Sequence, residues 1–247
     1  MPDHRPFVLI ADLEGPISLN RPLHVDGILY DVLFKRGGEV DFSATLHCVT
    51  HRAGIPCSSA GLVVYESLGG VTRTTMKRLR GIRLSREGDI IAYDPGPRGH
   101  RTRAISDMSE YRMQMPSYPL LFGATQIWWQ ILGDPDAVLD LASDVAGLGR
   151  LRQHGYGTVR RWHITDCAAD PRLAGHITGN GQIIRRLPVK AFTDVFKMPI
   201  PDGLPVDHGR PVAPYWSEDG ATEIVEPDLD DLIMHVDRAE MVLEVIT

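Results

Sequence analysis

The sequence has few cysteines and no long apolar run. Its 247 residues include three scattered cysteines, Cys48, Cys57 and Cys167, which argues against a disulfide framework and against a zinc knuckle. No apolar run reaches the roughly 18 residues that a membrane span needs. The first residues, MPDHRPFVLIADLEG, lack the basic, apolar and small-residue segments of a secretory signal. We therefore expect a cytoplasmic protein without a membrane partner.

Two common phosphate-binding loops are also missing, although residues 147–162, GLGRLRQHGYGTVRRW, hold four glycines and four arginines. A Walker loop ends in Gly-Lys-Ser/Thr before a helix, and a dinucleotide fingerprint also leads from a strand into a helix. This segment instead leaves a predicted helix and enters a predicted strand. Helix N-terminal amides are therefore not its source of attraction for anions.

The net charge of -6 conceals an uneven distribution. Residues 72–103 carry nine Lys/Arg against three Asp/Glu, and residues 150–190 carry eight against two. Residues 191–247 carry three basic and thirteen acidic residues. Two separate basic segments in an acidic protein suggest a local polyanion site, although a run of charge can also be a solvated face without a ligand.

Apolar patterning predicts three strands and a first helix. PFVLIADL (6–13) and TQIWWQIL (125–132) are short apolar runs typical of buried strands, and TVRRWHIT (158–165) is predicted as a third. RPLHVDGILYDVLFKR (21–36) has apolar residues at helical spacing, and Pro22 suits a first-turn position. These segments predict a domain that mixes helices with a buried sheet.

A second helix is predicted between the last two of these strands. Asp134 is its expected N-cap, Pro135 its first residue and Gly147 its C-terminal cap. With the interrupted strand-like stretch at 40–70, the order becomes strand, helix, strands, strand, helix, strand. This order predicts an α+β fold with a ferredoxin-like (RRM-like) βαββαβ core.

The domain organisation follows from the same reading. We expect one ferredoxin-like domain over 1–190, interrupted by a basic hairpin or long loop at 72–103 with turn residues inside it. The proline-rich, acidic residues 191–247 are expected to form an irregular C-terminal extension packed on that domain.

The glycine-rich loop favours a ligand that carries phosphate along a chain. Glycines allow positive φ angles and close approach of a ligand, which would leave backbone amides free in a concave nest. The neighbouring arginines would neutralise a sugar-phosphate chain without reading its sequence. The alternative is that these glycines serve only the local backbone, and for Gly147 alone a capping role is favoured.

The segment GLGRLRQHGYGTV after a helix resembles the glycine-rich loop of the RAMP superfamily, the RNA-binding ferredoxin-like proteins of CRISPR systems. RPLHVDGILYDVLF and RPVAPYW are similar to segments of the type IV CRISPR subunit of the Cas-five-like group. The resemblance implies a subunit that caps the 5′ handle of the CRISPR RNA and contacts neighbouring subunits, and the arginines of 72–103 could also reach target DNA near the protospacer-adjacent motif. The basic insertion would then correspond to a thumb-like element.

The candidate RNA-binding residues come from the loop, the insertion and the start of the first helix. They are Gly147, Gly149, Arg150, Arg152, His154, Gly155, Tyr156, Gly157, Arg160, Arg161, His24, Arg73, Lys77, Arg78, Arg80, Arg83, Arg98, Arg101 and Arg103. Tyr156 would either stack on a base or pack inward. No cofactor or metal is expected.

Two enzyme hypotheses remain as alternatives to a non-catalytic subunit. One is a metal-independent CRISPR repeat endoribonuclease on the same fold, with His24 or His154 as the acid-base residue, since a histidine can take the proton of a 2′-hydroxyl. A capping or core role for His24 is the competing interpretation. The other is a small-molecule phosphate enzyme, which is weaker because no nucleophile or metal-ligand arrangement appears at a usable spacing.

Overall fold

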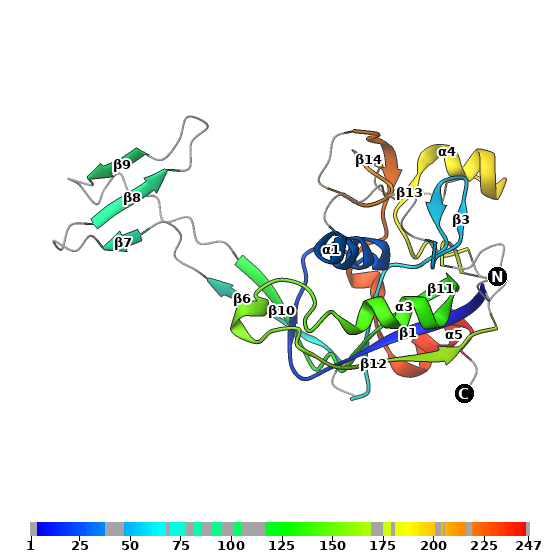
Figure 1. Cartoon of the computed structure of the whole chain (residues 1–247), viewed down its shortest axis with the longest axis horizontal. Helices are drawn as coiled ribbons and strands as arrows, with labels where there is room; N and C mark the ends of the chain where they lie inside the picture. The colour runs from blue at the N-terminus through cyan, green and yellow to red at the C-terminus, as the bar shows by residue number, and fades with distance from the viewer. Residues whose placement is uncertain are drawn as a thin grey trace. The chain divides into compact units, whose positions relative to one another are not determined.

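The chain folds as a mixed α+β protein in which strands outnumber helices in the described part (Figure 1). The computed structural model describes residues 4–37, 47–67, 70–77, 82–84, 90–94, 101–104, 117–168, 175–178, 181–200, 204, 206–215 and 219–245, with backbone alone within 75–118. Two compact units are formed, one by residues 1–72 with 121–247 and one by residues 73–120.

The elements follow one another along the chain with short connections between many of them. In order, they are β1 (Arg5–Leu13), β2 (Ile17–Ser18), α1 (Val25–Gly37), β3 (His51–Arg52), β4 (Ile55–Pro56), β5 (Leu62–Tyr65), β6 (Thr72–Lys77), β7 (Ile82–Leu84), β8 (Ile90–Asp94), β9 (Arg101–Ala104), β10 (Ser117–Phe122), β11 (Gln126–Gly133), α3 (Pro135–Ser143), β12 (Val159–Asp166), β13 (Leu187–Pro188), α4 (Val189–Ala191), β14 (Val206–Gly209), β15 (Thr222–Val225), β16 (Ile233–His235) and α5 (Val236–Leu243).

A five-stranded sheet with the order β12-β1-β11-β5-β16 forms the centre of the larger unit. β1 is antiparallel to both β11 and β12, and β11 is antiparallel to β5. β16 joins β5 in the parallel direction. The sequence prediction that 6–13 is a central strand is therefore confirmed, as are the strands expected near 125–132 and 158–165.

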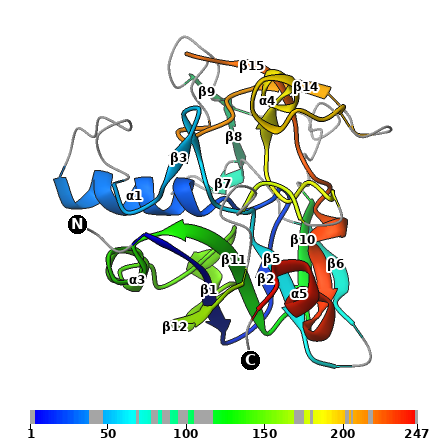
Figure 2. The same ribbon diagram turned by 90° about the vertical axis from the view of Figure 1, so that its right-hand side faces the viewer.

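Each face of this sheet is buried against a different set of helices (Figure 2). Phe7 and Leu9 alternate with Val8 and Ile10 along β1, so the two pairs point to opposite faces. The first pair packs with α1 and α3, while the second packs with α5. Both faces of β1 are thus covered, which explains why its sequence is continuously apolar.

The first helix starts later than predicted. α1 begins at Val25, so Pro22 lies before it and not in its first turn. The residues just before β5 hold this backbone in an extended conformation. His24 forms an isolated β-bridge with Ala60, and the Leu23 carbonyl accepts a hydrogen bond from Gly61 N at 2.7 Å. These tertiary contacts set the start of the helix.

The second helix begins as predicted and ends earlier. Asp134 Oδ1 accepts hydrogen bonds from the amides of Asp136 and Ala137, both at 3.1 Å, and caps α3. The helix ends at Ser143 with Asp144 as its cap. The predicted capping role of Gly147 is therefore wrong, since Gly147 pairs with Thr158 in an isolated β-bridge.

The C-terminal extension is more regular than its proline content predicted. It supplies β14 and β15 to a small three-stranded sheet, β16 to the central sheet, and α5 to the face opposite α1 and α3. Short strands of three or four residues carry little periodic signal, so only pairing with distant segments identifies them.

Residues 73–120 form the second unit around a three-stranded antiparallel sheet of β7, β8 and β9. β6 and β10 are neighbours in another sheet, and in the sequence they stand at the beginning and at the end of this unit. The sequence predicted a hairpin or long loop over 72–103. Strands are present within that range.

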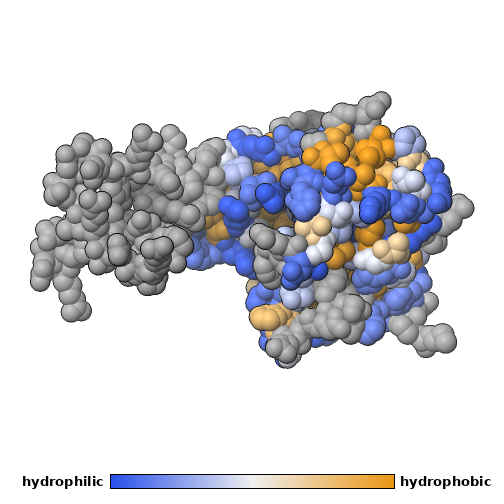
Figure 3. Space-filling view, turned by 90° about the horizontal axis from the view of Figure 1, so that it is seen from above, coloured by the Kyte–Doolittle hydropathy of each residue, from blue (hydrophilic) through white to orange (hydrophobic). Residues whose placement is uncertain are grey.

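Hydrophobic side chains form the buried core of the described residues, and on the face seen in Figure 3 hydrophobic patches lie beside hydrophilic ones. All three cysteines are buried, and none of them forms a disulfide. In the described part of the chain, no helix combines the length and apolar character that crossing a membrane requires.

Candidate functional site

The glycine-rich loop between α3 and β12 is a tightly folded segment. A short 3-10 helix, Arg152–His154, occupies its middle. Backbone φ angles are positive at Gly149, Gly155 and Gly157, a region that side-chain-bearing residues enter at a cost of about 1–2 kcal/mol. The three glycines therefore allow the chain to reverse between α3 and β12.

Two of these glycines are needed because backbone atoms approach them closely. A Cβ at Gly149 would lie 2.5 Å from the Ser18 oxygen, and one at Gly157 would lie 2.1 Å from the Leu148 oxygen. No such neighbour meets Gly155, which faces open space. Gly149 and Gly157 thus serve the packing of the loop on β2 and on itself.

The expectation that the loop leaves its backbone amides free is wrong for several of them. Arg150 N donates to Ser18 O at 2.9 Å, and Gly157 N donates to Pro16 O at 2.8 Å. Leu148 N and Gly155 N also donate to backbone carbonyls. These amides are already satisfied, so they are not available to an anion, and the exposed arginines are the groups of the loop that remain available to one.

The four arginines of the loop region fall into two pairs. Arg150 and Arg152 are exposed, and neither forms an ion pair with a described residue; Arg152 Nη1 donates to Gly147 O at 3.4 Å. Arg161 instead donates to the buried Asp12 carboxylate through Nε at 3.0 Å and Nη2 at 2.9 Å, and Arg160 lies 4.0 Å from it. Asp12 therefore compensates one charge of the second pair, that of Arg161, whereas the first pair faces no described carboxylate.

A groove runs between α1 and the glycine-rich loop, and we name it the α1–loop groove. It consists of two adjoining hollows of about 640 and 350 Å³. The residues that line both hollows are Asp31, Val145, Gly147 and Arg152. The wider hollow extends to Lys35 and Tyr156, whereas the narrower one extends to His24 and Tyr215.

Three exposed arginines line the narrower hollow of this groove: Arg21, Arg150 and Arg152. Arg21, on the segment before α1, was not among the candidates from sequence, and it forms no hydrogen bond or ion pair with another described residue. The acidic residues of the groove already have basic partners, because Asp31 accepts from Lys35 at 2.5 Å and Asp144 accepts from Arg36 at 2.6 Å. The groove thus carries uncompensated positive charge.

The other loop candidates occupy two settings. Tyr156 is half-buried and lines the wider hollow beside Thr158. His154 is exposed at the end of the 3-10 helix and lines neither hollow. Tyr156 is therefore the aromatic side chain of the loop that a ligand in the groove would meet.

The candidates of the insertion belong to the smaller unit. Arg73, Lys77, Arg83, Arg101 and Arg103 lie on strands β6, β7 and β9. Arg78, Arg80 and Arg98 lie outside the described residues. Among the five on strands, only Arg73 is described beyond its backbone, and its side chain is exposed.

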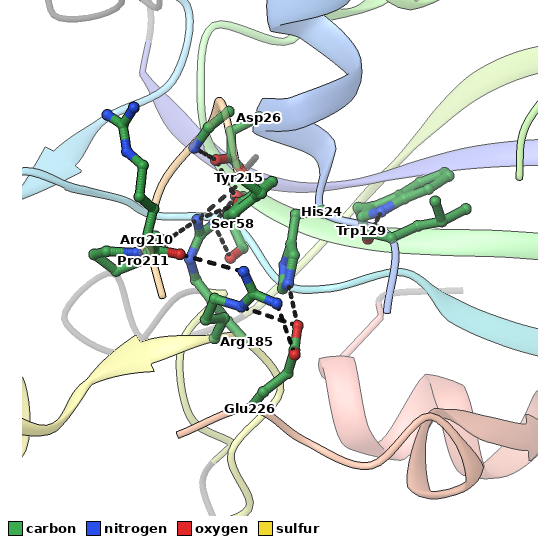
Figure 4. A network of polar contacts seen from close by, with 12 residues as sticks. His24, Asp26, Ser58, Trp129, Arg185, Arg210, Pro211, Tyr215 and Glu226 are labelled. Atoms are coloured by element: carbon green, nitrogen blue, oxygen red, sulfur yellow. Dashed lines mark hydrogen bonds and ion pairs between the residues drawn. The ribbon is translucent and has the colours of Figure 1, made fainter. Parts of the chain in front are cut away.

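A buried polar network, shown in Figure 4, ties the start of α1 to the C-terminal extension. Arg185 is fully buried and donates to Asp26 at 3.2 Å, to Ser58 Oγ at 2.7 Å and to the Pro211 carbonyl at 3.3 Å. Tyr215 donates its hydroxyl to Asp26 at 2.7 Å. Gly27 accommodates the same tyrosine, since a Cβ there would lie 3.2 Å from Tyr215 Cε2.

Charge compensation governs the pKa values in this network. Burial alone would raise the pKa of Asp26, but the Arg185 guanidinium holds it below its usual value. Burial and the neighbouring Asp26 carboxylate raise the pKa of Tyr215 well above its ordinary value. Asp26 and Arg185 are therefore both charged at neutral pH, and Tyr215 remains a hydrogen-bond donor.

His24 belongs to a second part of the network, next to the groove. Its Nε2 lies 3.3 Å from Glu226 Oε1, and Arg186 donates to both oxygens of Glu226, at 3.0 and 2.7 Å. Burial lowers the pKa of His24, so its ring is neutral at pH 7. Because an ionised carboxylate only accepts hydrogen bonds, Nε2 carries the proton and Nδ1 is left as an acceptor.

Sequence reasoning missed Asp12, Arg21 and the Asp26–Arg185 pair as determinants of this site. Asp26 and Arg185 lie 159 positions apart, and no local pattern connects them. A partial signal existed for Asp12, a lone acidic residue inside the apolar run of β1, because a buried carboxylate needs a partner.

The comparisons with known proteins add no further constraint. No protein-family model and no curated protein matches this chain. Within the described residues, no three side chains of the metal-ligating types come together.

Proposed function

We propose that this chain is an RNA-binding subunit of a ribonucleoprotein complex, namely the subunit that holds the 5′ handle of a guide RNA in a type IV CRISPR effector complex. The observation that carries the proposal is the α1–loop groove, with three exposed arginines that no described carboxylate neutralises. The resemblance of the loop and of two further segments to the RAMP superfamily supplies the kind of complex.

The arrangement of the central sheet supports a ferredoxin-like core, which we propose as part of the same assignment. Its strands β12-β1-β11-β5 are consecutive antiparallel neighbours, and α1 and α3 both pack on one face. A βαββαβ unit with split β-α-β connections gives this order of elements.

The groove is favoured over the sheet as the RNA surface. RRM domains stack bases on an open sheet face, but here the face opposite α1 and α3 is covered. Val8, Ile10 and Trp128 are buried there against α5 and its neighbours. An RNA chain would instead lie along the α1–loop groove, with phosphates near the arginines and with Tyr156 within reach of a base.

The remaining parts fit the same proposal. Basic residues of the insertion, from Arg73 to Arg103, would grip the RNA or a target duplex as a thumb-like element. The acidic C-terminal extension would face neighbouring subunits. Direct contact with target DNA near the protospacer-adjacent motif belongs to the proposal through the resemblance alone.

A second candidate function is a metal-independent endoribonuclease. It is favoured by one observation: His24 lines the groove, is neutral, and is held by Glu226 at 3.3 Å. Incubation of the protein with repeat RNA separates the two functions, because cleavage that disappears in His24→Ala identifies the enzyme. Binding without cleavage supports the clamp.

The proposal is tested with two matched double variants. Arg150→Ala/Arg152→Ala removes two unpaired charges from the groove, and Arg160→Ala/Arg161→Ala removes two that lie beside Asp12. We expect the first to weaken binding of guide-length RNA by about tenfold or more per lost contact and to reduce the salt slope of log K by about 0.7 per lost contact. The second should change affinity by less than about threefold, since neither side chain lines the groove and Asp12 already pairs with Arg161.

Fluorescence anisotropy between 50 and 300 mM salt measures both quantities. Equal losses of RNA affinity in the two variants would show that the groove is not the binding surface. If the wild-type protein binds no RNA, either alone or in its complex, the proposed function is wrong.

A further inference from the structure

The narrower hollow of the α1–loop groove has walls suited to a flat apolar ring. Its volume is about 350 Å³, at the low end of the range of small-molecule sites. Leucine, isoleucine and valine side chains and the Tyr215 ring contribute to the lining, from the segment before α1, from α1 itself, from the loop and from the C-terminal extension. Three segments distant in sequence, namely residues 18–31, residues 145–152 and Tyr215, thus line one space.

Two buried polar side chains line the same hollow and each has an atom without a hydrogen-bond partner. They are Ser18, whose Oγ has none, and His24, whose Nδ1 has none, within the described part of the chain. Ser18 is fully buried and His24 is 6% exposed. Leaving such a group unsatisfied costs about 1–3 kcal/mol, so each calls for a ligand or a bound water.

The charged residues of the hollow are arranged for a ligand with a phosphate. Arg21, Arg150 and Arg152 are exposed and positive. Asp31 is the acidic residue of the lining, and Lys35 already compensates it. Apolar walls, two inner polar atoms and outer arginines therefore occur together.

We propose that this hollow is a binding site for a single nucleotide, whose base enters between the apolar walls and whose phosphate lies against the three arginines. The base would donate an N–H group to His24 Nδ1 and share a hydrogen bond with Ser18 Oγ, which can both donate and accept. Both protein atoms are shielded in the free chain, so a rotation of the lining side chains accompanies binding.

The inference deepens the proposed function and rests on it, because the nucleotide would be one residue of the bound RNA, flipped out of the stack. Sequence-tolerant contacts to phosphates hold a chain without selecting it. A pocket that hydrogen-bonds the edge of one base supplies selection at one position, since the four bases differ in their donors and acceptors.

Titration with the four ribonucleoside monophosphates and with inorganic phosphate, followed by calorimetry or NMR, tests the site. We expect at least one nucleotide to bind tenfold or more tightly than inorganic phosphate, and the four to differ from one another. Ser18→Ala should weaken the preferred nucleotide by about three- to tenfold, because it removes one hydrogen bond, without loss of folding.

A second pair of variants tests the space itself. Ile28→Trp places a large ring in the lining of the hollow, and Phe34→Trp is its control on the same helix, because Phe34 is 53% exposed and lines neither hollow. Nucleotide binding should be abolished in the first variant and unchanged in the second. Equal affinity for inorganic phosphate and for the nucleotides would overturn the inference. Unchanged nucleotide affinity in folded Ser18→Ala, or in folded Ile28→Trp, would also overturn it.

The two proposals fail differently. The protein could bind RNA with the expected salt dependence and yet show no nucleotide preference and no effect of Ser18→Ala. That result would support the proposed function and contradict the nucleotide pocket. Conversely, binding of a nucleotide in the hollow without binding of RNA would support the pocket and contradict the RNA-binding function.

Discussion

Two groups of arginines in this protein have opposite surroundings. Arg185 and Arg186 are buried and engaged by carboxylates, Asp26 and Glu226 respectively. Arg21, Arg150 and Arg152 are exposed along the α1–loop groove and face no unpaired described carboxylate. All but Arg21 lie in one basic segment of the sequence, 150–190, yet the fold separates them into an internal and a displayed set.

The difference shows that a basic segment is not by itself a binding surface. A buried guanidinium with several acceptors fixes one arrangement of the chain, because removing one partner leaves an uncompensated charge. An exposed guanidinium without a partner contributes little to folding and remains available to a polyanion. The two groups should therefore respond to mutation in different assays.

The largest expected effect is on stability at the internal pair. Arg185→Ala leaves the Asp26 carboxylate buried without its cation and should lower the free energy of unfolding by about 3–5 kcal/mol. Arg185→Lys keeps the charge but loses the fork of donors that reaches Ser58, Asp26 and Pro211, so an intermediate loss is expected. Urea denaturation followed by circular dichroism measures both.

The control for this prediction is Arg5→Ala. Arg5 pairs with Asp166 at the surface, where both side chains are largely exposed, and surface pairs contribute about 0–1 kcal/mol. A loss in Arg185→Ala no larger than that of the control would contradict the structural role of the internal pair.

The next effect concerns the loop that displays the groove arginines. Gly157→Ala would place a Cβ 2.1 Å from Leu148 O at a positive φ of 68°, and conformational strain with overpacking should destabilise the protein by about 2–4 kcal/mol. Gly155→Ala has the same kind of backbone at φ 81° but open space around it, and should cost only about 1–2 kcal/mol. Thermal unfolding of the two variants compares them, and equal losses would show that close packing does not explain Gly157.

A smaller effect is expected from Glu226, which pairs with Arg186 and lies 3.3 Å from His24, a residue that lines the groove. Burial would raise the pKa of Glu226, but hydrogen bonds from His24 and Arg186 lower it from 4.5 to about 2. Because the folded-state pKa lies below that of the unfolded chain, this stabilisation is complete above pH 4.5 and declines as the pH falls toward 2.

Glu226→Gln removes this titration while it keeps an acceptor for the same donors. The variant should be less stable than the wild-type protein near neutral pH, and the difference should shrink as the pH falls below 4.5. Denaturant unfolding at a series of pH values measures it. A difference that stays constant across this range would show that the carboxylate of Glu226 is not selectively stabilised in the folded chain.

The sequence predicted the elements that local patterns determine. The apolar run of β1, the Asp134 cap of α3 and the strand that leaves the glycine-rich loop were all found as expected. The start of α1 was wrong because contacts from Ala60 and Gly61 hold the preceding residues extended. Local propensity alone does not contain such information.

The candidate site was harder to predict for the same reason. The loop and its arginines were identified from the sequence. In the structure, however, Arg161 forms an ion pair with Asp12 of another strand, and Arg21 from the segment before α1 lines the groove. Three of the loop glycines were expected to make room for a ligand, whereas Gly149 and Gly157 make room for the protein's own backbone. Which side chains are free depends on long-range partners that only the folded chain specifies.

The smallest expected effect on stability is that of the groove arginines. Arg150→Ala/Arg152→Ala removes no described ion pair and a single long hydrogen bond, from Arg152 to Gly147 O at 3.4 Å. The free energy of unfolding should therefore change by less than about 0.5 kcal/mol, as measured by urea denaturation beside Arg185→Ala. A loss of several kcal/mol would show that these side chains belong to the internal group, and the reduced RNA binding expected of this variant would then reflect unfolding. A small change joined to a loss of binding would separate the arginines that hold the fold from those available to a ligand.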